Sequence, residues 1–435
     1  MDLSLFADGP LAGTAELPGD KSLSHRAALF ATLAEGESVI EHFLDAGVTR
    51  ALLSALNRFG IQWWLSDDCL TLKGHGYRPL RNCAGRPLVI PCRNSATTLR
   101  LLAGAVAGTG TVCVLDGSEG LRKRPMERIL EPLRLLGCPV ESENGFAPIT
   151  FRSLRGVERS PIHYTLPVAS AQVKSCLILA ALGVEGETVL TEPGPSRDHT
   201  ERMLRSMGAD IVTEPGHVVR VHSLRESLSP LHIRLPGDLS SAAFLLAAAA
   251  CRPDSSILLK EVGVNPTRTG FLDVLAAMGA SVELLNEHEV CGEPVADIRL
   301  EARPLHGVEI EGDLVVRMID EFPVFAALAC AADGVSRVRG AAELRYKESD
   351  RIASLCVELR KLGAKIEESP DGFSIEGGPL AGGEAEAHGD HRLAMALALS
   401  GLFAENEVIV HGAEILEESF PDFAVSLEEL GVSSC

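Results

Sequence analysis

Two stretches of the sequence place basic and hydroxyl side chains just before an apolar, helix-like run, and a third, basic stretch precedes an amphipathic helix pattern that ends at Gly137. They are residues 19–26 (GDKSLSHR), 93–100 (RNSATTLR) and 121–128 (LRKRPMER). The start of a helix attracts anions through its free backbone N–H groups and its dipole, so these positions suit a phosphate or a carboxylate. The first stretch is not a Walker A loop, because the Gly-x4-Gly-Lys-Ser/Thr pattern is absent. The alternatives are a solvated loop charge at Lys21, a capping box at 93–100 and a hydrated surface run at 121–128.

Acidic and basic residues alternate in three further stretches, each again expected just before a helix. They are residues 319–323 (IDEFP), 347–351 (KESDR) and 390–392 (DHR). Carboxylates can act as acid or base, and guanidinium groups can hold an anion through two hydrogen bonds. The pattern therefore indicates proton transfer beside a bound anion. Ion pairing at the surface is the alternative for any one of these stretches.

The elements that must position these residues form a repeat. An amphipathic helix pattern that ends in Gly and leads into a strand-like run recurs at intervals of 68 to 84 residues. The glycines are Gly60, Gly137, Gly208, Gly279, Gly363 and Gly431. The phrase Leu-Pro-Gly-Asp also occurs twice, at residues 17–20 and 235–238, an offset of 218 residues or half the chain. The chain is therefore predicted to contain six copies of one α/β unit.

An almost wholly apolar run precedes each amphipathic helix, and a helix of that kind must be buried on all sides. The runs are residues 25–34, 96–108, 171–183, 241–250, 323–334 and 392–404. Three runs in each half predict a helical interior with the sheets outside. The fold class is therefore α/β, with two inside-out, barrel-like lobes of three βαβαββ-type units each. Six unrelated α/β units in a doubly wound sheet are the alternative.

The boundary between the lobes is expected near residues 230–236, because the run 229–238 (SPLHIRLPGD) contains two prolines and a glycine. The N-terminal lobe would comprise residues 15–234, and the C-terminal lobe residues 1–14 and 235–435. Two short connections between similar lobes suggest a two-stranded hinge. Closure of such a hinge on a ligand would exclude water from the chemistry.

The composition disfavours several classes of protein. The 435 residues include 60 acidic and 40 basic side chains, and the net charge of -20 opposes binding to nucleic acid or an anionic membrane. No two of the 11 cysteines lie within four residues of each other, which excludes CxxC-type zinc and redox motifs. The start lacks the basic and apolar regions of a signal peptide, and apolar runs of about ten residues are too short to span a bilayer. We expect a cytoplasmic protein with free thiols.

Taken together, the chemical stretches and the repeat resemble one family, 5-enolpyruvylshikimate-3-phosphate synthase, over nearly the whole chain. The similar strings are LPGDKSLSHR (17–26), NSATTLRLLAG (94–104), RPMERILEPLRLLG (124–137), ASAQVKSCLILAAL (169–182), EPGPSRDHTERML (192–204), LPGDLSSAAF (235–244), VGVNPTRTG (262–270), ELRYKESDRI (343–352), DHRLAMA (390–396) and SFPDF (419–423). The resemblance implies the enolpyruvyl transferase fold, two inside-out lobes of three units each. That fold agrees with the repeat count.

The resemblance also implies residues for each substrate. The shikimate-3-phosphate contacts would be Lys21, Ser22, Arg26, Ser170, Ala171, Gln172, Ser196, Arg197, Asp320 and Lys347. The phosphoenolpyruvate contacts would be Lys21, Asn94, Ala96, Arg124, Gln172, Arg351 and Arg392. The 5-hydroxyl of shikimate-3-phosphate would attack C2 of phosphoenolpyruvate while C3 is protonated, and the adduct would then lose phosphate and a methyl proton. We expect Glu348 to act at the methylene, Asp320 near the 5-hydroxyl, and Lys21 to stabilise charge or share proton transfer. This chemistry needs no metal and no organic cofactor.

The sequence departs from the family pattern at two places. The family's Gly-Asn-(Ala/Ser)-Gly-Thr loop reads Arg93-Asn-Ser-Ala-Thr97 here, so Ala96 adds a methyl group where the backbone should approach phosphoenolpyruvate closely. We therefore expect reduced sensitivity to glyphosate, a longer analogue. Glu418 stands where some members have a phosphoenolpyruvate-binding Lys, and we leave it out of the site.

Two other functions remain as alternatives. UDP-N-acetylglucosamine enolpyruvyl transferase shares the fold and the chemistry, but it relies on a loop cysteine at the position of Glu119. A nucleic-acid-directed use of the fold, as in RNA-end cyclases, is disfavoured by the net charge. The sequence indicates no partner protein, and a monomer is the default expectation.

Overall fold

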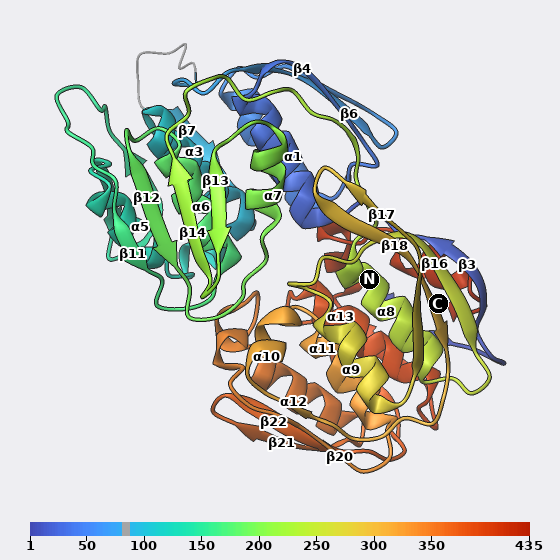
Figure 1. The fold of residues 1–435 in the computed structure, drawn as a ribbon. Coiled ribbons are helices and arrows are strands. Elements are labelled where there is room, and N and C mark those ends of the chain that lie inside the picture. Colours follow the sequence, from blue (N-terminus) through green and yellow to red (C-terminus); the bar gives the residue numbers. More distant parts are fainter. Residues whose placement is uncertain (81–87) are drawn as a thin grey trace. The chain divides into compact units, whose positions relative to one another are not determined.

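The chain forms two compact units in the computed structural model, which describes residues 1–80 and 88–435 (Figure 1). The N-terminal unit consists of Gly19–Leu235 and the short segment Val290–Glu293. The C-terminal unit consists of Met1–Pro18, Pro236–Glu289 and Pro294–Cys435. The chain therefore crosses between the units at 18/19 and 235/236, and twice more around residues 290–293.

Leu235, expected in the C-terminal lobe, belongs to the N-terminal unit, and the boundaries differ from the expected lobes at two further points. Residues 15–18 belong to the C-terminal unit, because β3 (Ala12–Glu16) pairs in parallel with β16 (Ser256–Gly263). Residues 290–293 belong to the N-terminal unit. There Glu293 Oε1 lies 2.8 Å from His199 Nδ1, and the Gly292 carbonyl accepts a hydrogen bond of 2.6 Å from Arg202. These two further differences depend on contacts between segments that are far apart in the sequence, so local sequence patterns do not reveal them.

The described part of the N-terminal unit contains three four-stranded sheets, with strand orders β15-β4-β6-β5, β7-β8-β10-β9 and β11-β12-β14-β13. Its strands are β4 (Glu35–Glu41), β5 (Trp63–Ser66), β6 (Cys69–His75), β7 (Leu88–Pro91), β8 (Cys113–Asp116), β9 (Val140–Glu143), β10 (Phe146–Phe151), β11 (His163–Thr165), β12 (Glu187–Thr191), β13 (Ile211–Glu214), β14 (Val218–His222) and β15 (His232–Arg234). Its helices are α1 (Lys21–Leu33), α2 (Gly47–Arg58), α3 (Ala96–Thr109), α4 (Glu119–Arg122), α5 (Glu127–Leu135), α6 (Ala171–Ala181) and α7 (His199–Ser206).

The C-terminal unit is built in the same way, with sheets ordered β17-β18-β16-β3, β19-β20-β22-β21, β1-β24-β23 and the small pair β2-β25. Its strands, besides β3 and β16, are β1 (Asp2–Leu3), β2 (Leu5–Phe6), β17 (Ser281–Val290), β18 (Glu293–Glu301), β19 (Glu309–Ile310), β20 (Val335–Val338), β21 (Lys365–Ser369), β22 (Gly372–Glu376), β23 (Gly383–Glu386), β24 (Val408–His411) and β25 (Ser433–Ser434). Its helical segments are α8 (Leu239–Ala250), α9 (Gly270–Met278), α10 (Asp313–Arg317), α11 (Phe322–Cys330), η1 (Ala342–Tyr346), α12 (Arg351–Lys361), α13 (His391–Leu399), η2 (Ser400–Leu402), η3 (Ala413–Glu418) and α14 (Phe423–Glu428).

The sheets repeat one topology. In the N-terminal unit each sheet has a parallel outer pair followed by antiparallel neighbours, as in β7-β8-β10-β9. The sheet β19-β20-β22-β21 of the C-terminal unit has the same arrangement. The first sheet of each unit takes its parallel edge strand from a distant segment, β15 in one unit and β3 in the other. The predicted fold class is confirmed, and a single doubly wound sheet is excluded for the described residues.

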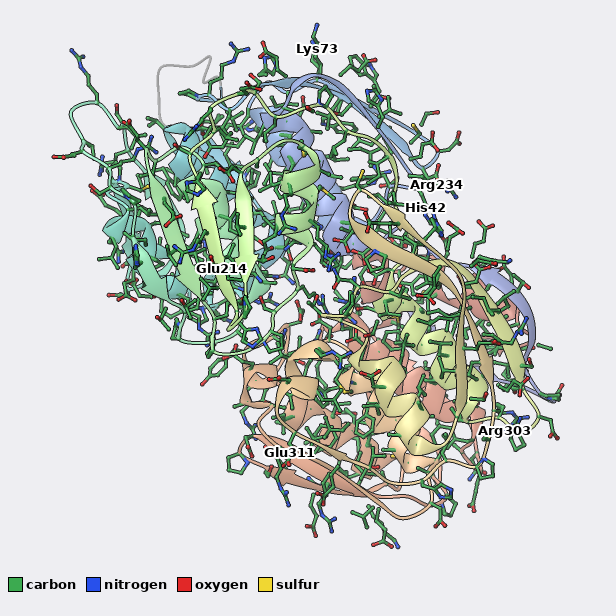
Figure 2. The ribbon with its side chains drawn as sticks, in the orientation of Figure 1. His42, Lys73, Glu214, Arg234, Arg303 and Glu311 are labelled. Atoms are coloured by element: carbon green, nitrogen blue, oxygen red, sulfur yellow. The ribbon has the colours of Figure 1, made fainter. Side chains whose placement is uncertain are left out.

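The predicted apolar runs are the buried helices. Every residue of α8, α11 and α13 is buried, and one apolar core fills each unit. The strands alternate, as β6 shows: Leu70 and Leu72 are buried, whereas Lys73 projects into solvent (Figure 2). This alternation is typical of sheets with one face on the core. The helices therefore lie inside each unit and the sheets cover them.

The six repeat glycines end the amphipathic helices as predicted. Each follows α2, α5, α7, α9, α12 or α14 within three residues, and each has a φ angle between +81° and +109°. Only glycine adopts this backbone region without steric cost, and it is the usual residue after a helix C-terminus. Among the described residues, no helix is both long and apolar enough to cross a membrane.

The close packing of α3 against α6 predicts that a side chain added at Gly104 would lower the stability of the protein. A Cβ atom added at Gly104 in α3 would lie 2.2 Å from the backbone oxygen of Cys176 in α6. Gly104→Ala should therefore force the two helices apart and lower the free energy of unfolding by about 1–3 kcal/mol. Urea denaturation measures this loss. Gly378→Ala is the matched control, because a Cβ atom there would meet nothing within 4 Å. Equal stability of the two variants would contradict the packing argument.

Candidate active site

The start of α1 presents two predicted residues and buries a third. Asp20 caps the helix by accepting a hydrogen bond of 2.8 Å from the Leu23 N–H, and Lys21 and Ser22 are half-buried in the first turn. Arg26, one turn further, is almost fully buried. Its guanidinium donates to Thr200 Oγ1 at 2.8 Å, Ser175 Oγ at 2.9 Å and the Ser22 carbonyl at 3.0 Å.

These bonds give Arg26 an internal role. They join the starts of α1, α6 and α7 and hold the backbone at Ser22. Burial lowers the pKa of Arg26 to about 10, so the side chain stays charged at neutral pH. Arg26 therefore supports the turn that carries Lys21 and Ser22, and its predicted direct contact with substrate stays a prediction.

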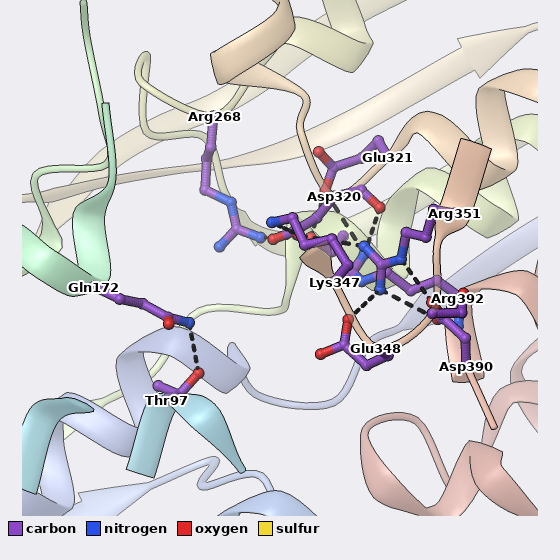
Figure 3. Close-up of polar contacts among 12 residues, drawn as sticks. Thr97, Gln172, Arg268, Asp320, Glu321, Lys347, Glu348, Arg351, Asp390 and Arg392 are labelled. Atoms are coloured by element: carbon purple, nitrogen blue, oxygen red, sulfur yellow. Dashed lines mark hydrogen bonds and ion pairs between the residues drawn. The ribbon is translucent and has the colours of Figure 1, made fainter. Parts of the chain in front are cut away.

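The start of α3 orients Gln172. Gln172 Nε2 donates to Thr97 Oγ1 at 2.9 Å (Figure 3). Arg100 donates to Gln172 Oε1 at 2.6 Å. The two bonds fix which end of the amide points to which neighbour. The sequence assigned no role to Arg100, although its position one turn after Ala96 in a charged stretch is a usable signal.

The rest of the 93–100 stretch forms an ordinary helix start. Ser95 caps α3 by accepting from the Thr98 N–H, and Asn94 Oδ1 accepts from Ser118 Oγ at 2.9 Å. Ala96 is the first residue of α3 and is buried. Arg93 has a φ angle of +50°, a backbone region that favours glycine. Arg93 therefore stands in a backbone conformation that a glycine would adopt more easily.

The 121–128 stretch is partly a surface run. Arg122 pairs with Asp116 and Lys123 with Glu119 at the exposed surface. Arg124 is half-buried in the turn before α5. The surface alternative thus holds for Arg122 and Lys123, and the role of Arg124 stays a prediction. Glu119, predicted to stand at the position of the sister transferase's loop cysteine, forms this exposed ion pair in a four-residue helix.

A buried ion triad lies next to Ser196, one of the predicted shikimate-3-phosphate contacts. Lys174 Nζ lies 2.6 Å from Glu192 Oε2, 2.8 Å from Glu201 Oε1 and 3.4 Å from the Ser196 carbonyl. Burial opposes the charge of Lys174, but the two carboxylates outweigh it and raise the pKa of Lys174. The triad fixes the backbone at Ser196.

The neighbouring predicted residues lie at the same end of the N-terminal unit's helices. Ser170, Ala171 and Gln172 are half-buried at the start of α6, and Arg197 is half-buried just before α7. Sequence reasoning missed Lys174, although a lysine in an otherwise apolar helix is a signal for a buried partner.

The C-terminal unit brings its predicted residues together around Arg351. This side chain is only 1% exposed, and its guanidinium lies 2.7 Å from Asp390, 2.8 Å from Glu348 and 3.6 Å from Asp320 (Figure 3). Burial disfavours the charge of Arg351, but the attraction of Asp390 and then Glu348 raises its pKa further. For Asp390, burial alone would raise the pKa, yet the adjacent Arg351 keeps it lowered.

Two further cations border Asp320. Lys347 Nζ lies 3.3 Å from Asp320 Oδ1, and Arg392 donates to the Asp320 carbonyl at 3.1 Å. Asp320 and Glu348 remain partly exposed, with side-chain exposures of 20% and 25%. The arrangement places two partly exposed, ionisable carboxylates beside the cations of Lys347, Arg351 and Arg392, which suits proton transfer beside an anion. Asp390 holds Arg351 but carried no predicted role.

The predicted residues thus form two sets, one in each unit. Lys21 lies in the N-terminal unit, whereas Asp320 and Glu348 lie in the C-terminal unit. Their joint action stays a prediction. Glu418 is half-buried at the end of η3. In residues 1–80 and 88–435, no group of three or more His, Cys, Asp or Glu side chains is placed to hold a metal ion.

The protein has two units of one repeated α/β construction, with cations and carboxylates at their helix starts. These features are those of the enolpyruvyl transferase class. The model of the family described as "EPSP synthase (3-phosphoshikimate 1-carboxyvinyltransferase)" matches residues 7–427. The chain belongs to this family.

Relatives and solved structures agree. The 3-phosphoshikimate 1-carboxyvinyltransferase of Geobacter metallireducens is 46% identical over 425 residues, 97% of each chain. That of Syntrophomonas wolfei is 44% identical over 418 residues, 95% of this chain and 96% of the relative. A solved structure of EPSP synthase from Acinetobacter baumannii has a TM-score of 0.87 and 38% identity, and covers 100% of this chain and 99% of that chain. The resemblance inferred from the sequence is confirmed.

The buried triad predicts a large loss of stability on removal of its cation. Lys174→Met would leave Glu192 and Glu201 buried without their counter-charge, and we expect the free energy of unfolding to fall by about 3–5 kcal/mol. Lys123→Met removes one partner of an exposed pair and should cost less than about 1 kcal/mol. Chemical denaturation of both variants measures the difference. If Lys174→Met lowered the free energy of unfolding no more than Lys123→Met, the stabilising role of the buried triad would be contradicted.

Proposed function

We propose that the charged residues of both units act together on phosphoenolpyruvate and shikimate-3-phosphate. As a member of its family, the enzyme transfers the enolpyruvyl group of phosphoenolpyruvate to the 5-hydroxyl of shikimate-3-phosphate and releases phosphate, a step in the biosynthesis of aromatic amino acids. The observation that carries the assignment of residues is the cluster around Arg351, in which two partly exposed carboxylates lie among three cations.

The proton transfers are assigned to the two partly exposed carboxylates. In the addition step, the 5-hydroxyl oxygen bonds to C2 of phosphoenolpyruvate and its proton passes to Asp320, while Glu348 gives a proton to C3. In the elimination step, C3 returns a proton to Glu348 and the C2–O bond to the phosphate group breaks. The departing phosphate takes the proton held by Asp320, so both carboxylates return to their starting state. Lys21 stabilises the charge that develops or shares in proton transfer. Arg351 supports the assignment, because it fixes the direction of the Glu348 carboxylate.

The anionic groups are assigned to cations and helix starts. Shikimate-3-phosphate would contact Lys21, Ser22, Arg26, Ser170, Ala171, Gln172, Ser196, Arg197, Asp320 and Lys347. Phosphoenolpyruvate would contact Lys21, Asn94, Ala96, Arg124, Gln172, Arg351 and Arg392. The double anchoring of Gln172 supports its place in both sets, since a fixed amide can present a defined donor or acceptor to a substrate.

The proposal also covers the hinge, the oligomeric state and the cellular location of the protein. The crossings at 18/19 and 235/236 would form a hinge between the units. The protein would act as a monomer. It would reside in the cytoplasm, which is supported by the free thiols of the ten cysteines that the structure describes. Cys83 lies outside the described residues.

Phosphate release tests the function directly. The purified enzyme should release phosphate from phosphoenolpyruvate with shikimate-3-phosphate and not with UDP-N-acetylglucosamine. Release with the second acceptor alone would favour the sister transferase. Release with neither would mean that the altered loop at 93–97 has disabled the phosphoenolpyruvate site.

The two carboxylates predict a specific loss of turnover. Glu348→Gln and Asp320→Asn should each lower kcat about 10²–10⁴-fold, the range for loss of a positioned acid or base. Glu407→Gln, at an exposed position of the same unit, should leave kcat unchanged. Steady-state phosphate release measures all three. Wild-type turnover in either site variant would remove that carboxylate from the proposed mechanism.

Glyphosate should inhibit this enzyme weakly. The Ala96 methyl lies at the first residue of α3, where we propose that phosphoenolpyruvate approaches the backbone, so a longer analogue is crowded. Ala96→Gly should lower the half-inhibitory glyphosate concentration about tenfold, since relief of such crowding is worth about 1–3 kcal/mol. Ala103→Gly in the same helix is the control for helix weakening. Strong inhibition of the unaltered enzyme near the half-saturating phosphoenolpyruvate concentration would contradict the hypothesis.

A further inference from the structure

The second Leu-Pro-Gly-Asp motif is built like the first but faces inward. Asp238 caps α8 by accepting a hydrogen bond of 2.7 Å from the Ser240 N–H, much as Asp20 caps α1. Leu239, which is buried, stands where the first motif has Lys21. This helix start therefore offers no cation to a substrate, and its polar side chains contact other groups of the C-terminal unit.

Ser240 links a buried arginine to a buried glutamate. Arg268 donates to Asp238 Oδ1 and to Ser240 Oγ, both at 2.9 Å, and Ser240 Oγ forms a short hydrogen bond with Glu321 Oε1. A guanidinium group can only donate, so the Ser240 hydroxyl accepts from Arg268 and directs its own hydrogen to Glu321. All of these side chains are at least nine-tenths buried. The position of the Glu321 carboxylate is thereby fixed.

Glu321 lies directly behind the proposed site. It follows Asp320 in the chain and precedes α11, and its side chain is 1% exposed. Its Oε1 lies 3.9 Å from Nη1 of Arg392, the same nitrogen that donates to the Asp320 carbonyl (Figure 3). A fixed negative charge on this side attracts the guanidinium and restricts a side chain that otherwise has many rotamers.

We infer that Glu321 is a positioning residue for Arg392, held in place by Ser240 and Arg268. The inference rests on the proposed role of Arg392 in binding an anionic group of phosphoenolpyruvate. Glu321 orients the guanidinium before the substrate arrives, and through the Asp320 carbonyl it also steadies the segment that carries the Asp320 carboxylate. Groups behind a binding residue commonly act in this way, because a misplaced clamp loses much of its effect.

Glu321→Gln tests the inference with little change of shape. The amide can still accept from Ser240, but the charge that attracts Arg392 is lost. We expect KM for phosphoenolpyruvate to rise about tenfold, while KM for shikimate-3-phosphate stays within about twofold. Ser240→Ala should shift KM in the same direction by less, and it supplies the readout if Glu321→Gln does not fold. An unchanged KM for phosphoenolpyruvate in the folded variants would overturn the inference.

Asp297→Asn is the matched control. Asp297 is another buried carboxylate of this unit, but its partners are Lys260, Asn286 and the Glu261 N–H, all in the β16–β18 sheet region. Its loss should lower stability without a selective change of KM for phosphoenolpyruvate. If Glu321→Gln and Asp297→Asn raised both KM values alike, Glu321 would be merely structural and the inference would fail.

Arg392→Lys separates this inference from the proposed function. If Arg392→Lys leaves KM for phosphoenolpyruvate unchanged, the proposed role of Arg392 fails, and the inference with it. If Arg392→Lys raises KM but Glu321→Gln does not, only the positioning inference fails. If Glu321 acts through Arg392, the double variant should be no worse than Arg392→Lys alone. Additive effects of the two changes would overturn the inference.

Discussion

Arg351 and its three carboxylates fix the chemistry of the C-terminal unit. A guanidinium that is 1% exposed cannot be left without counter-charges, because an uncompensated buried charge costs several kcal/mol. Asp390 from the start of α13, Glu348 from the turn before α12 and Asp320 from the turn before α11 supply them. Three helix starts must therefore meet at one point. Because both lie against Arg351, the partly exposed carboxylates of Asp320 and Glu348 are held in defined directions.

The N-terminal unit uses buried cations for the same purpose. Arg26 and Lys174 satisfy their charges and hydrogen bonds inside the unit, and in doing so they hold the backbone at Ser22 and Ser196. Lys21 is left half-buried at a helix start, where it can meet a ligand. The second Leu-Pro-Gly-Asp motif has Leu239 in place of a lysine. Its polar side chains form hydrogen bonds inside the C-terminal unit.

The repeat, the buried helices and the helix-ending glycines could be read from the sequence because each depends on neighbours within a few residues. So could the stretches that supply Lys21, Gln172, Glu348 and Arg392, since helix starts are recognised locally. The groups that hold them were missed. Ser240 and Glu321 are 81 residues apart, and Ser240 and Arg268 are 28 apart, so no local spacing joins them. The placement of residues 15–18 and 290–293 escaped prediction for the same reason.

The sequence by itself determined the repeated α/β construction, the family and the chemical types present at each helix start, because apolar periodicity, caps and glycines act over one or two turns of chain. Only the tertiary structure decided which charged side chains face a ligand and which face each other. Arg26 and Arg351 are sequence neighbours of partly exposed site residues, yet both are buried among partners from distant segments. Burial of a charge depends on counter-charges that the folded chain brings together, and that arrangement is not written in local spacing.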